Sequence, residues 1–255
     1  MLFDSHAHYN DKRFEDDVDE VLSLMPQNNV GAILNACSSI DEIPYILKLC
    51  EKYPFMYASV GVHPHEVSKM CENDIEILKE YSKNKKVVAI GEIGLDYYYD
   101  YSPRDLQKKW FARQLELARE INLPVIIHDR DAHLDSLKVL KDGKVHECGG
   151  VFHCYSGSAE MAREVLNLDM YIAFGGSLTF KNAKNPVESA KYVPLERILI
   201  ETDCPYLAPE PNRGKRNSSL YIHLVAEKLA QIKGISVEEV EQQTFINAQK
   251  CFRLN

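Results

Sequence analysis

The sequence predicts a parallel (β/α)8 barrel, the TIM-barrel class, because short apolar segments rich in Val and Ile alternate with longer segments of helical periodicity. Near-continuous apolar segments are typical of strands that are buried on both faces of a parallel sheet. Eight such segments follow one another, at residues 1–8, 30–36, 55–63, 87–94, 124–128, 150–154, 170–176 and 197–203. A length of 255 residues suits one barrel, so we expect a single domain over residues 1–255. A doubly wound open sheet is the alternative, since the sequence does not show whether the sheet closes.

Helical segments lie between the predicted strands. The clearest span residues 14–29, 41–53, 72–84 and 102–122, and two amphipathic helices are expected to end the chain. In the segment 102–122, Ser102 is placed as the N-cap and Pro103 at the first helical position. A loop rich in Pro, Gly and Arg, residues 204–219, follows the eighth strand.

Composition limits the class of protein. The chain has 30 basic and 38 acidic residues, and its net charge of −8 argues against broad coating of nucleic acid. The same charge allows an enzyme that concentrates positive charge in a cleft. No apolar run approaches the roughly 18 residues that span a membrane, and no signal peptide is visible. Seven cysteines without a Cys-x-x-Cys pair favour reduced thiols and a cytoplasmic protein.

Histidines and carboxylates gather at the predicted strand ends. His6 and His8 share one face of the first strand, because strand side chains repeat every two residues. Four further strands contribute Glu92, His128, His153 and Asp203. The carboxyl ends of barrel strands converge on the face where barrel enzymes hold their catalytic groups. A carbonyl-bonded histidine or a solvated carboxylate would explain any one of these residues, but together in apolar strands they predict a metal site.

Six donors exceed the needs of one four-coordinate ion, so we expect two divalent cations. We assign His6, His8 and Asp203 to the first ion and His128 and His153 to the second. Glu92 has two carboxylate oxygens and is expected to bridge them. Two ions about 4 Å apart suit hydrolysis of a phosphoester. Asp203 and Glu92 are the expected catalytic residues, with Asp203 orienting or deprotonating the attacking water.

These motifs resemble the TatD family of metal-dependent deoxyribonucleases, in the amidohydrolase-like barrel group. The resemblance runs essentially end to end and is carried by FDSHAH, GVHPH, AIGEIGLDYY, PVIIHDRDA, GVFHCYSGS, FGGSLTFKNA, LIETDCPYL and RGKRN. It implies a (β/α)8 barrel, two divalent cations and hydrolysis of phosphodiester bonds in DNA, often as a 3′→5′ exonuclease. It also assigns metal ligation to the same six positions, His6, His8, Glu92, His128, His153 and Asp203.

Two details of the chain bear on this resemblance. Ser218 and Ser219 follow the Arg-Asn of the last motif, where family members often carry Pro, and the first His-x-His, which some members lack, is present. The family implies Mg²⁺ or Mn²⁺, whereas four imidazoles favour Zn²⁺, Mn²⁺, Co²⁺ or Ni²⁺ over Mg²⁺. The sequence therefore leaves the metal open.

Several residues are candidates for substrate contact. His63 could contact the scissile phosphate or be a buried, hydrogen-bonded histidine, and His65 is a weaker candidate. Arg213, Lys215 and Arg216 form a dense basic cluster that could contact phosphate or simply be solvated. Tyrosines after the fourth strand could stack on bases or pack internally; they are Tyr97, Tyr98, Tyr99 and Tyr101. Tyr155 and Asn217, in the resembling motifs, are also assigned to substrate, and Arg130 is expected to pair with a carboxylate.

Two other functions are weighed. One is an amidohydrolase-type enzyme acting on a small ester, lactone, amide or phosphotriester. Many such sites use a carbamylated Lys on the fourth strand, and residues 87–94 contain none. The other is a non-catalytic scaffold, against which the intact donor set argues. We expect DNA as the substrate, single-stranded DNA included, with no membrane partner and a monomer or weak oligomer.

Overall fold

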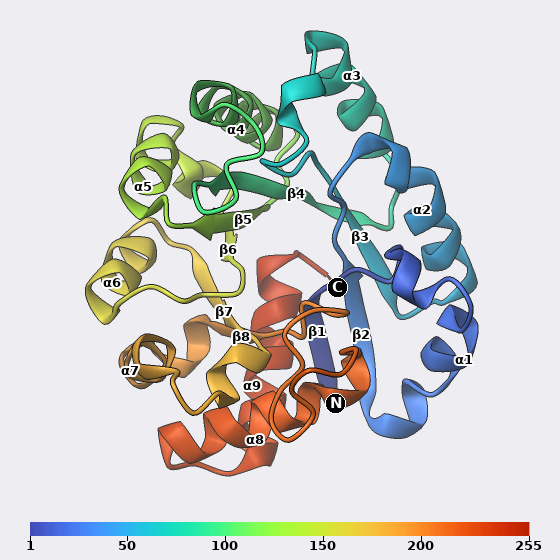
Figure 1. Ribbon diagram of the computed structural model, residues 1–255, viewed down its shortest axis with the longest axis vertical. Helices are drawn as coiled ribbons and strands as arrows, with labels where there is room; N and C mark the ends of the chain where they lie inside the picture. Colours follow the sequence, from blue (N-terminus) through green and yellow to red (C-terminus); the bar gives the residue numbers. More distant parts are fainter. Residues whose placement is uncertain (255) are drawn as a thin grey trace.

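The computed structural model describes residues 1–254, which form one eight-stranded sheet curled into a barrel (Figure 1). The strands are all parallel and pair in chain order; they are β1 (Leu2–Ala7), β2 (Val30–Asn35), β3 (Met56–Val60), β4 (Val87–Asp96), β5 (Val125–Arg130), β6 (Gly150–Phe152), β7 (Tyr171–Phe174) and β8 (Ile198–Ile200). A parallel bridge between Ala7 and Cys204 joins the end of β1 to the chain after β8. The predicted (β/α)8 barrel is confirmed, and the open sheet is wrong.

Helices surround the strands on the outside of the ring (Figure 1). They are α1 (Val18–Ser23), α2 (Ile43–Lys52), α3 (Glu72–Tyr81), α4 (Arg104–Glu120), α5 (His133–Asp142), α6 (Ala159–Asn167), α7 (Lys184–Tyr192), α8 (Ile222–Lys233) and α9 (Val237–Cys251). The predicted helix over 14–29 is shorter than expected. Pro26 has no backbone N–H and begins a separate 3₁₀ turn, Pro26–Asn28, so α1 stops at Ser23.

The predicted start of α4 is wrong by one residue. Pro103 is the N-cap and the helix begins at Arg104. Ser102 instead joins two loops, because its hydroxyl donates to the carbonyl of His65 at 2.9 Å and accepts from the N–H of Ser68 at 3.2 Å. This serine therefore links the loop after β3 to the loop after β4, beside the predicted site.

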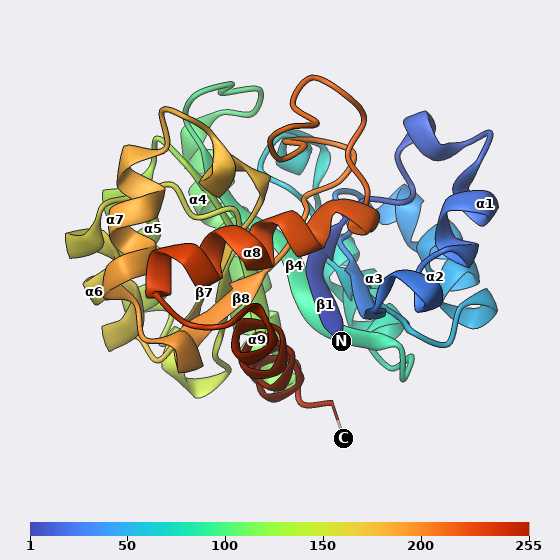
Figure 2. The same cartoon turned by 90° about the horizontal axis from the view of Figure 1, so that it is seen from below.

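Helix α9 closes the barrel at the end opposite the strand-end loops. Figure 2 shows it beneath the strands, at the end where the N-terminus lies. Phe252, directly after α9, packs with α9 residues against apolar side chains of the strands, among them Phe3, Leu34, Ile126 and Leu199. The floor of the barrel is therefore filled by apolar side chains, and the buried Asn247 of α9 donates to the carbonyls of Leu195 and of Ile198 at the start of β8.

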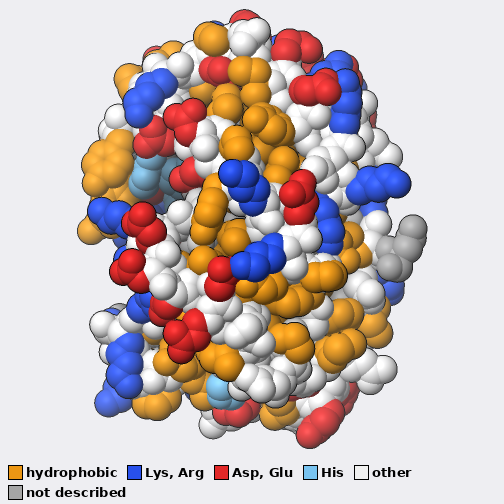
Figure 3. Space-filling model, turned by 90° about the vertical axis from the view of Figure 1, so that its right-hand side faces the viewer, with side chains coloured by type: hydrophobic (Ala, Val, Ile, Leu, Met, Phe, Trp, Pro, Cys, Tyr) orange, Lys and Arg blue, Asp and Glu red, His pale blue; other side chains and the backbone are white. Residues whose placement is uncertain are grey.

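The outer surface carries both signs of charge. On the side seen in Figure 3, Lys and Arg side chains are interspersed with Asp and Glu. In residues 1–254, no helix is both long and apolar enough to cross a membrane.

Candidate metal centre

The six predicted donors meet at the mouth of the barrel. His6 lies in β1, Glu92 in β4 and His128 in β5. His8 and His153 lie just past the ends of β1 and β6. Asp203 is not in β8 as the sequence suggested; it lies in the loop after Ile200, where its N–H donates to the carbonyl of His6 at 2.9 Å. Each donor is thus attached to rigid backbone at the same end of the sheet.

Two glycines on either side of Glu92 allow the backbone of β4 to lie close to β5. A Cβ at Gly91 would lie 2.7 Å from the Cβ of Ile126, and one at Gly94 would lie 1.9 Å from the carbonyl oxygen of His128. Gly94 also has a φ of +146°, which side chains rarely tolerate. The GEIG motif therefore permits close contact between β4 and β5, with Glu92 held over the barrel axis.

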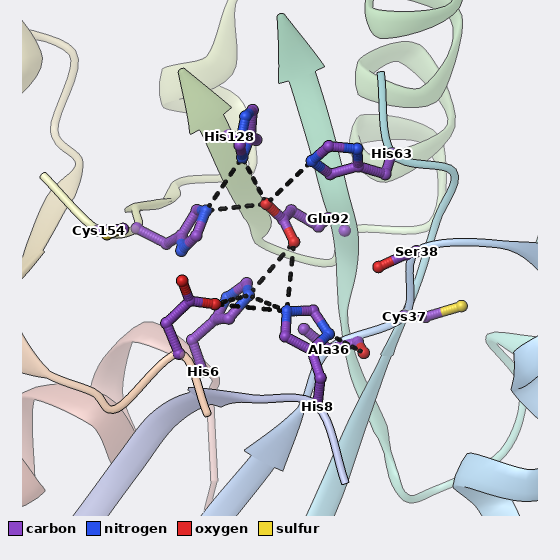
Figure 4. A network of polar contacts seen from close by, with 12 residues as sticks. His6, His8, Ala36, Cys37, Ser38, His63, Glu92, His128 and Cys154 are labelled. Atoms are coloured by element: carbon purple, nitrogen blue, oxygen red, sulfur yellow. Dashed lines mark hydrogen bonds and ion pairs between the residues drawn. The ribbon is translucent and has the colours of Figure 1, made fainter. Parts of the chain in front are cut away.

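The carboxylate of Glu92 separates the imidazoles into two groups (Figure 4). Its Oε2 lies 3.3 Å from Nε2 of His6 and 3.7 Å from Nε2 of His8. Its Oε1 lies 2.7 Å from Nδ1 of His128 and 2.8 Å from Nε2 of His153. One carboxylate therefore contacts two sets of nitrogen donors with different oxygens.

The first set contains His6, His8 and Asp203. The Nε2 atoms of His6 and His8 are 3.0 Å apart. Oδ1 of Asp203 lies 3.5 Å from Nε2 of His8 and 3.9 Å from Nε2 of His6. Their donor atoms all lie within 4.8 Å of one another, as binding of one ion requires.

The second set includes a residue that the sequence assigned to substrate. His63 has its Nε2 3.5 Å from Oε1 of Glu92, and His63, Glu92 and His128 form another group that could hold an ion. Nε2 of His153 lies 3.4 Å from Nδ1 of His128 and completes this side. His63 is therefore placed among the donors, next to the position predicted for the second cation.

Acceptors behind the imidazoles fix their orientation. Nδ1 of His8 lies 3.1 Å from the carbonyl of Ala36, which can only accept, so His8 donates there and its Nε2 faces Asp203. Nε2 of His128 lies 3.1 Å from Oδ2 of Asp96. Nδ1 of His153 lies 3.5 Å from Oε1 of Glu201, an ion-pair distance, and makes no hydrogen bond with any of residues 1–254. Outer carboxylates of this kind are characteristic of metal-binding histidines.

The sequence reasoning missed Asp96 and Glu201. Both are carboxylates at the ends of apolar strands, which is the signal that identified Glu92 and Asp203. Asp96 ends β4, and Glu201 directly follows β8. Applied to every strand end, the same rule would have found them.

Electrostatics keep the carboxylates ionised. Burial would raise the pKa of Glu92, but the surrounding imidazoles hold it well below its usual value. Burial would also raise the pKa of Asp203, but the hydrogen bond from His8 and the nearby histidines lower it. Burial lowers the pKa of His63 to about 4 and also lowers that of His6, so these two rings are neutral near pH 7. Burial would also lower the pKa values of His8, His128 and His153, but the neighbouring carboxylates raise them. The anionic oxygens therefore face two neutral imidazoles and three imidazoles that bind a proton more tightly than usual.

This donor set fits divalent cations. The Nε2 atoms of His6 and His8, at 3.0 Å, both face the carboxylates of Glu92 and Asp203, and Nδ1 of His6 is buried without a hydrogen-bond partner. A buried cluster of lone pairs and negative charge is costly unless cations occupy it. The residues present therefore match the metal chemistry that the sequence predicted.

The predicted substrate contacts divide into two kinds. His65 lies beside the cluster, with its Nε2 2.9 Å from Oδ2 of Asp96. Tyr155 is buried and its hydroxyl donates to the carbonyl of Ser158 at 2.7 Å, so it packs the wall of the barrel. Asn217 is also buried, and its amide donates to the carbonyls of Thr202 and Tyr206, both at 2.8 Å. Tyr155 and Asn217 thus make internal hydrogen bonds, and their contact with substrate stays a prediction.

The basic cluster after β8 is only partly free. Arg216 pairs with Asp17 at 2.5 Å, so its charge is already balanced. Arg213 is exposed, lies over the ring of Phe180 at 4.3 Å and forms no ion pair within residues 1–254. Arg130, predicted to pair with a carboxylate, lies instead over the rings of Tyr98 and Tyr99.

A (β/α)8 barrel with clustered histidines and carboxylates at its mouth defines the class of metal-dependent hydrolases. The chain belongs to the TatD family: residues 3–253 match the family model described as TatD related DNase. It is 46% identical over 255 residues to the uncharacterized metal-dependent hydrolase YabD of Bacillus subtilis, with all of both chains covered. It is 30% identical over 259 residues to the 3′-5′ ssDNA/RNA exonuclease TatD of Edwardsiella piscicida, covering 99% and 100% of the two chains.

A solved structure agrees with this assignment. The crystal structure of YJJV, a TatD homologue from Escherichia coli K12, superposes with a TM-score of 0.93 at 29% identity. The match covers 100% of this chain and 98% of that one. The predicted TatD resemblance is confirmed, and the protein is a metal-dependent hydrolase of this nuclease family.

Proposed function

We propose that the protein hydrolyses phosphodiester bonds of single-stranded nucleic acid, with DNA as its substrate, using two divalent cations held on either side of Glu92. The observation that carries this proposal is the division of donors by that carboxylate, with His6 and His8 toward Oε2 and His128 and His153 toward Oε1. Removal of nucleotides from the 3′ end is the favoured direction, since the relative from Edwardsiella piscicida is named as a 3′-5′ ssDNA/RNA exonuclease.

The bound cations would supply Lewis-acid activation of water and neutralise charge on the phosphoryl oxygens. His6, His8 and Asp203 would hold one of them, and His128 and His153 the other. Imidazoles combined with carboxylates accommodate Mn²⁺, Zn²⁺, Co²⁺ or Ni²⁺, and the family also favours Mg²⁺. Asp96 and Glu201 would keep His128 and His153 in the tautomer that directs a lone pair inward.

Asp203 is suited to act as the general base. Its pKa is held below its usual value, so it is ionised near neutral pH and can accept a proton from an attacking water. It lies in a loop over the mouth, and its side chain is more exposed than that of Glu92, 14% against 4%. Water and substrate therefore reach Asp203 more readily than they reach the bridging carboxylate.

His63 and His65 are suited to contact the phosphate beside the second set of donors. His63 is neutral near pH 7, with a pKa of about 4, and can donate one hydrogen bond. His65 donates to the ionised carboxylate of Asp96 through Nε2. Tautomers with a free N–H directed to the mouth would bind a phosphoryl oxygen.

Digestion of end-labelled strands tests this proposal. Single- and double-stranded DNA and RNA, labelled at either end, would be incubated with purified protein and Mg²⁺, Mn²⁺, Zn²⁺, Co²⁺ or Ni²⁺. We expect 5′-labelled single-stranded DNA to yield a ladder that shortens with time, and EDTA to abolish the reaction. Hydrolysis of a lactone or a phosphotriester with no cleavage of nucleic acid would replace this function with the amidohydrolase alternative.

A further inference from the structure

Three exposed tyrosines lie side by side in the loop between β4 and α4. Tyr98, Tyr99 and Tyr101 are 59%, 45% and 67% exposed, although tyrosine rings usually bury most of their surface. The rings of Tyr99 and Tyr101 are stacked, with centroids 5.3 Å apart at 28°. Tyr98 meets Tyr99 edge-on at 5.0 Å. We call these three side chains the tyrosine platform.

The platform is held in place by its backbone and by Tyr97. Oδ1 of Asp96 accepts from the N–H groups of Tyr98 and Tyr99 at 3.0 and 2.8 Å. The hydroxyl of Tyr97 donates to Asp135 at 2.6 Å, and Arg104 lies 4.2 Å over its ring. Tyr97 is thus used for anchoring, which leaves the other three rings fixed yet exposed. A fixed ring loses little conformational entropy when a ligand binds.

A positive charge lies on the platform. The guanidinium of Arg130 is 4.1 Å from the centroid of the Tyr98 ring and 4.7 Å from that of Tyr99. Within residues 1–254 this arginine forms no ion pair, unlike Arg216. Exposed aromatic rings beside an unpaired arginine combine the two elements of single-strand binding, a surface for stacking and a charge for phosphate.

The platform is continuous with the metal centre. His65 contacts the rings of Tyr99 and Tyr101 edge-on, with centroids 5.4 and 4.8 Å away. His65 also lies 2.9 Å from Asp96, which in turn contacts His128 at 3.1 Å. A strand with its scissile phosphate at Glu92 and His128 would therefore place neighbouring nucleotides over the tyrosines.

We propose that Tyr98, Tyr99 and Tyr101, with Arg130, form a stacking subsite for unpaired bases next to the cleaved phosphodiester. This inference rests on the proposed function and specifies its substrate: a strand with free base faces, rather than a duplex. Because every base has a π-face, the subsite would accept DNA or RNA with little sequence preference.

Binding measurements with and without bases test the subsite separately from catalysis. The probes are a fluorescein-labelled oligothymidylate of about ten nucleotides and an abasic strand of equal length, both phosphorothioate-linked to slow hydrolysis. Fluorescence anisotropy with the metal-loaded protein gives the Kd of each. The variants are the double substitution Tyr99→Ala with Tyr101→Ala, and the same pair changed to Phe. Tyr192→Ala is the matched control. Tyr192 is 48% exposed and is the last residue of α7, from which the chain runs to the start of β8, away from the mouth of the barrel.

We expect the double alanine variant to bind the thymidylate strand about 5- to 150-fold more weakly, the usual effect of losing one stacked base. Its Kd for the abasic strand should change less than about twofold, and the Phe pair and Tyr192→Ala should bind both strands as the wild type does. Unchanged thymidylate binding in the alanine variant would overturn the subsite while leaving the proposed function standing. A wild type that binds neither strand and also fails to cleave an ordinary phosphodiester-linked thymidylate strand would overturn both.

Discussion

Oε1 of Glu92 lies 2.7 Å from Nδ1 of His128, while the outer nitrogen of the same ring lies 3.1 Å from Asp96. The imidazole is therefore held between a carboxylate inside the site and a carboxylate behind it. The two contacts fix the orientation of the ring.

Replacing Glu92 should reduce turnover more than replacing His63. Glu92 contacts both sets of donors, whereas His63 contacts only the Oε1 side. Loss of a residue that only hydrogen-bonds a metal ligand typically lowers activity about 10- to 100-fold. Because Glu92 contacts both sets of donors directly, we expect Glu92→Gln to lower kcat by more than about 100-fold and His63→Ala by less. Steady-state kinetics on single-stranded DNA measure both values. Equal losses, or a larger loss for His63→Ala, would refute the bridging role.

Replacing His8 should remove one cation and leave the other. His8 and Asp203 belong to the first set of donors, while His128 and His153 belong to the second, and Glu92 contacts both sets. Elemental analysis of His8→Ala after dialysis should give about half the metal of the wild type. His223→Ala, an exposed histidine on α8, is the control. Wild-type metal content in His8→Ala would make the opening His-x-His a structural pair.

Arg213 and Arg216 should differ in their effect on DNA binding. We predict that Arg213→Ala raises KM and reduces the salt slope of binding by about 0.7, the loss of one contact to a single strand. Arg216 is neutralised by Asp17, so Arg216→Ala should change the slope much less. Titrations at several salt concentrations measure both slopes. If the slope falls for Arg216→Ala and not for Arg213→Ala, the loop contacts the strand through the other arginine.

The pair formed by His133 and Asp129 should make stability depend on pH. Nδ1 of His133 lies 2.7 Å from Asp129, and this hydrogen bond raises the pKa of His133 although partial burial opposes the shift. Because the folded pKa exceeds the unfolded value of about 6.5, the stabilisation is complete below that pH and is lost as the pH rises through the folded pKa. His133→Asn should therefore cost more unfolding free energy at about pH 5.5 than at about pH 9.

Urea denaturation at the two pH values measures this effect. The double variant with Asp129→Asn should show no further pH-dependent loss, since the pair is already broken. An equal cost of His133→Asn at both pH values would show that the two side chains do not interact in solution.

The sequence was most informative where periodicity and strand ends coincide. Apolar segments located all eight strands, and His6, His8, Glu92 and His128 could be placed at the mouth because parallel strands end on one side. It was least informative where a side chain has two possible partners. Arg216 and Asn217 follow Asp203 in the same loop of the chain. In the structure, Arg216 pairs with Asp17 and Asn217 donates to two backbone carbonyls. Such contacts join segments remote in sequence, and residue type does not reveal them.

The tyrosines after β4 show the same limit. Their sequence allowed either stacking or packing, and the choice depends on where Asp96 and Asp135 direct each residue. Asp135 binds the hydroxyl of Tyr97, and Asp96 binds the backbone of Tyr98 and Tyr99. The three-dimensional structure is needed to tell the anchored ring of Tyr97 from the exposed rings of Tyr98 and Tyr99.

The central claim, that Glu92 lies between two cations, is tested most directly by anomalous diffraction from crystals grown with Mn²⁺. The account predicts two anomalous peaks about 4 Å apart, one near His6, His8 and Asp203 and the other near His128 and His153, with one oxygen of Glu92 contacting each. A single peak, or two peaks neither of which contacts Glu92, would contradict it.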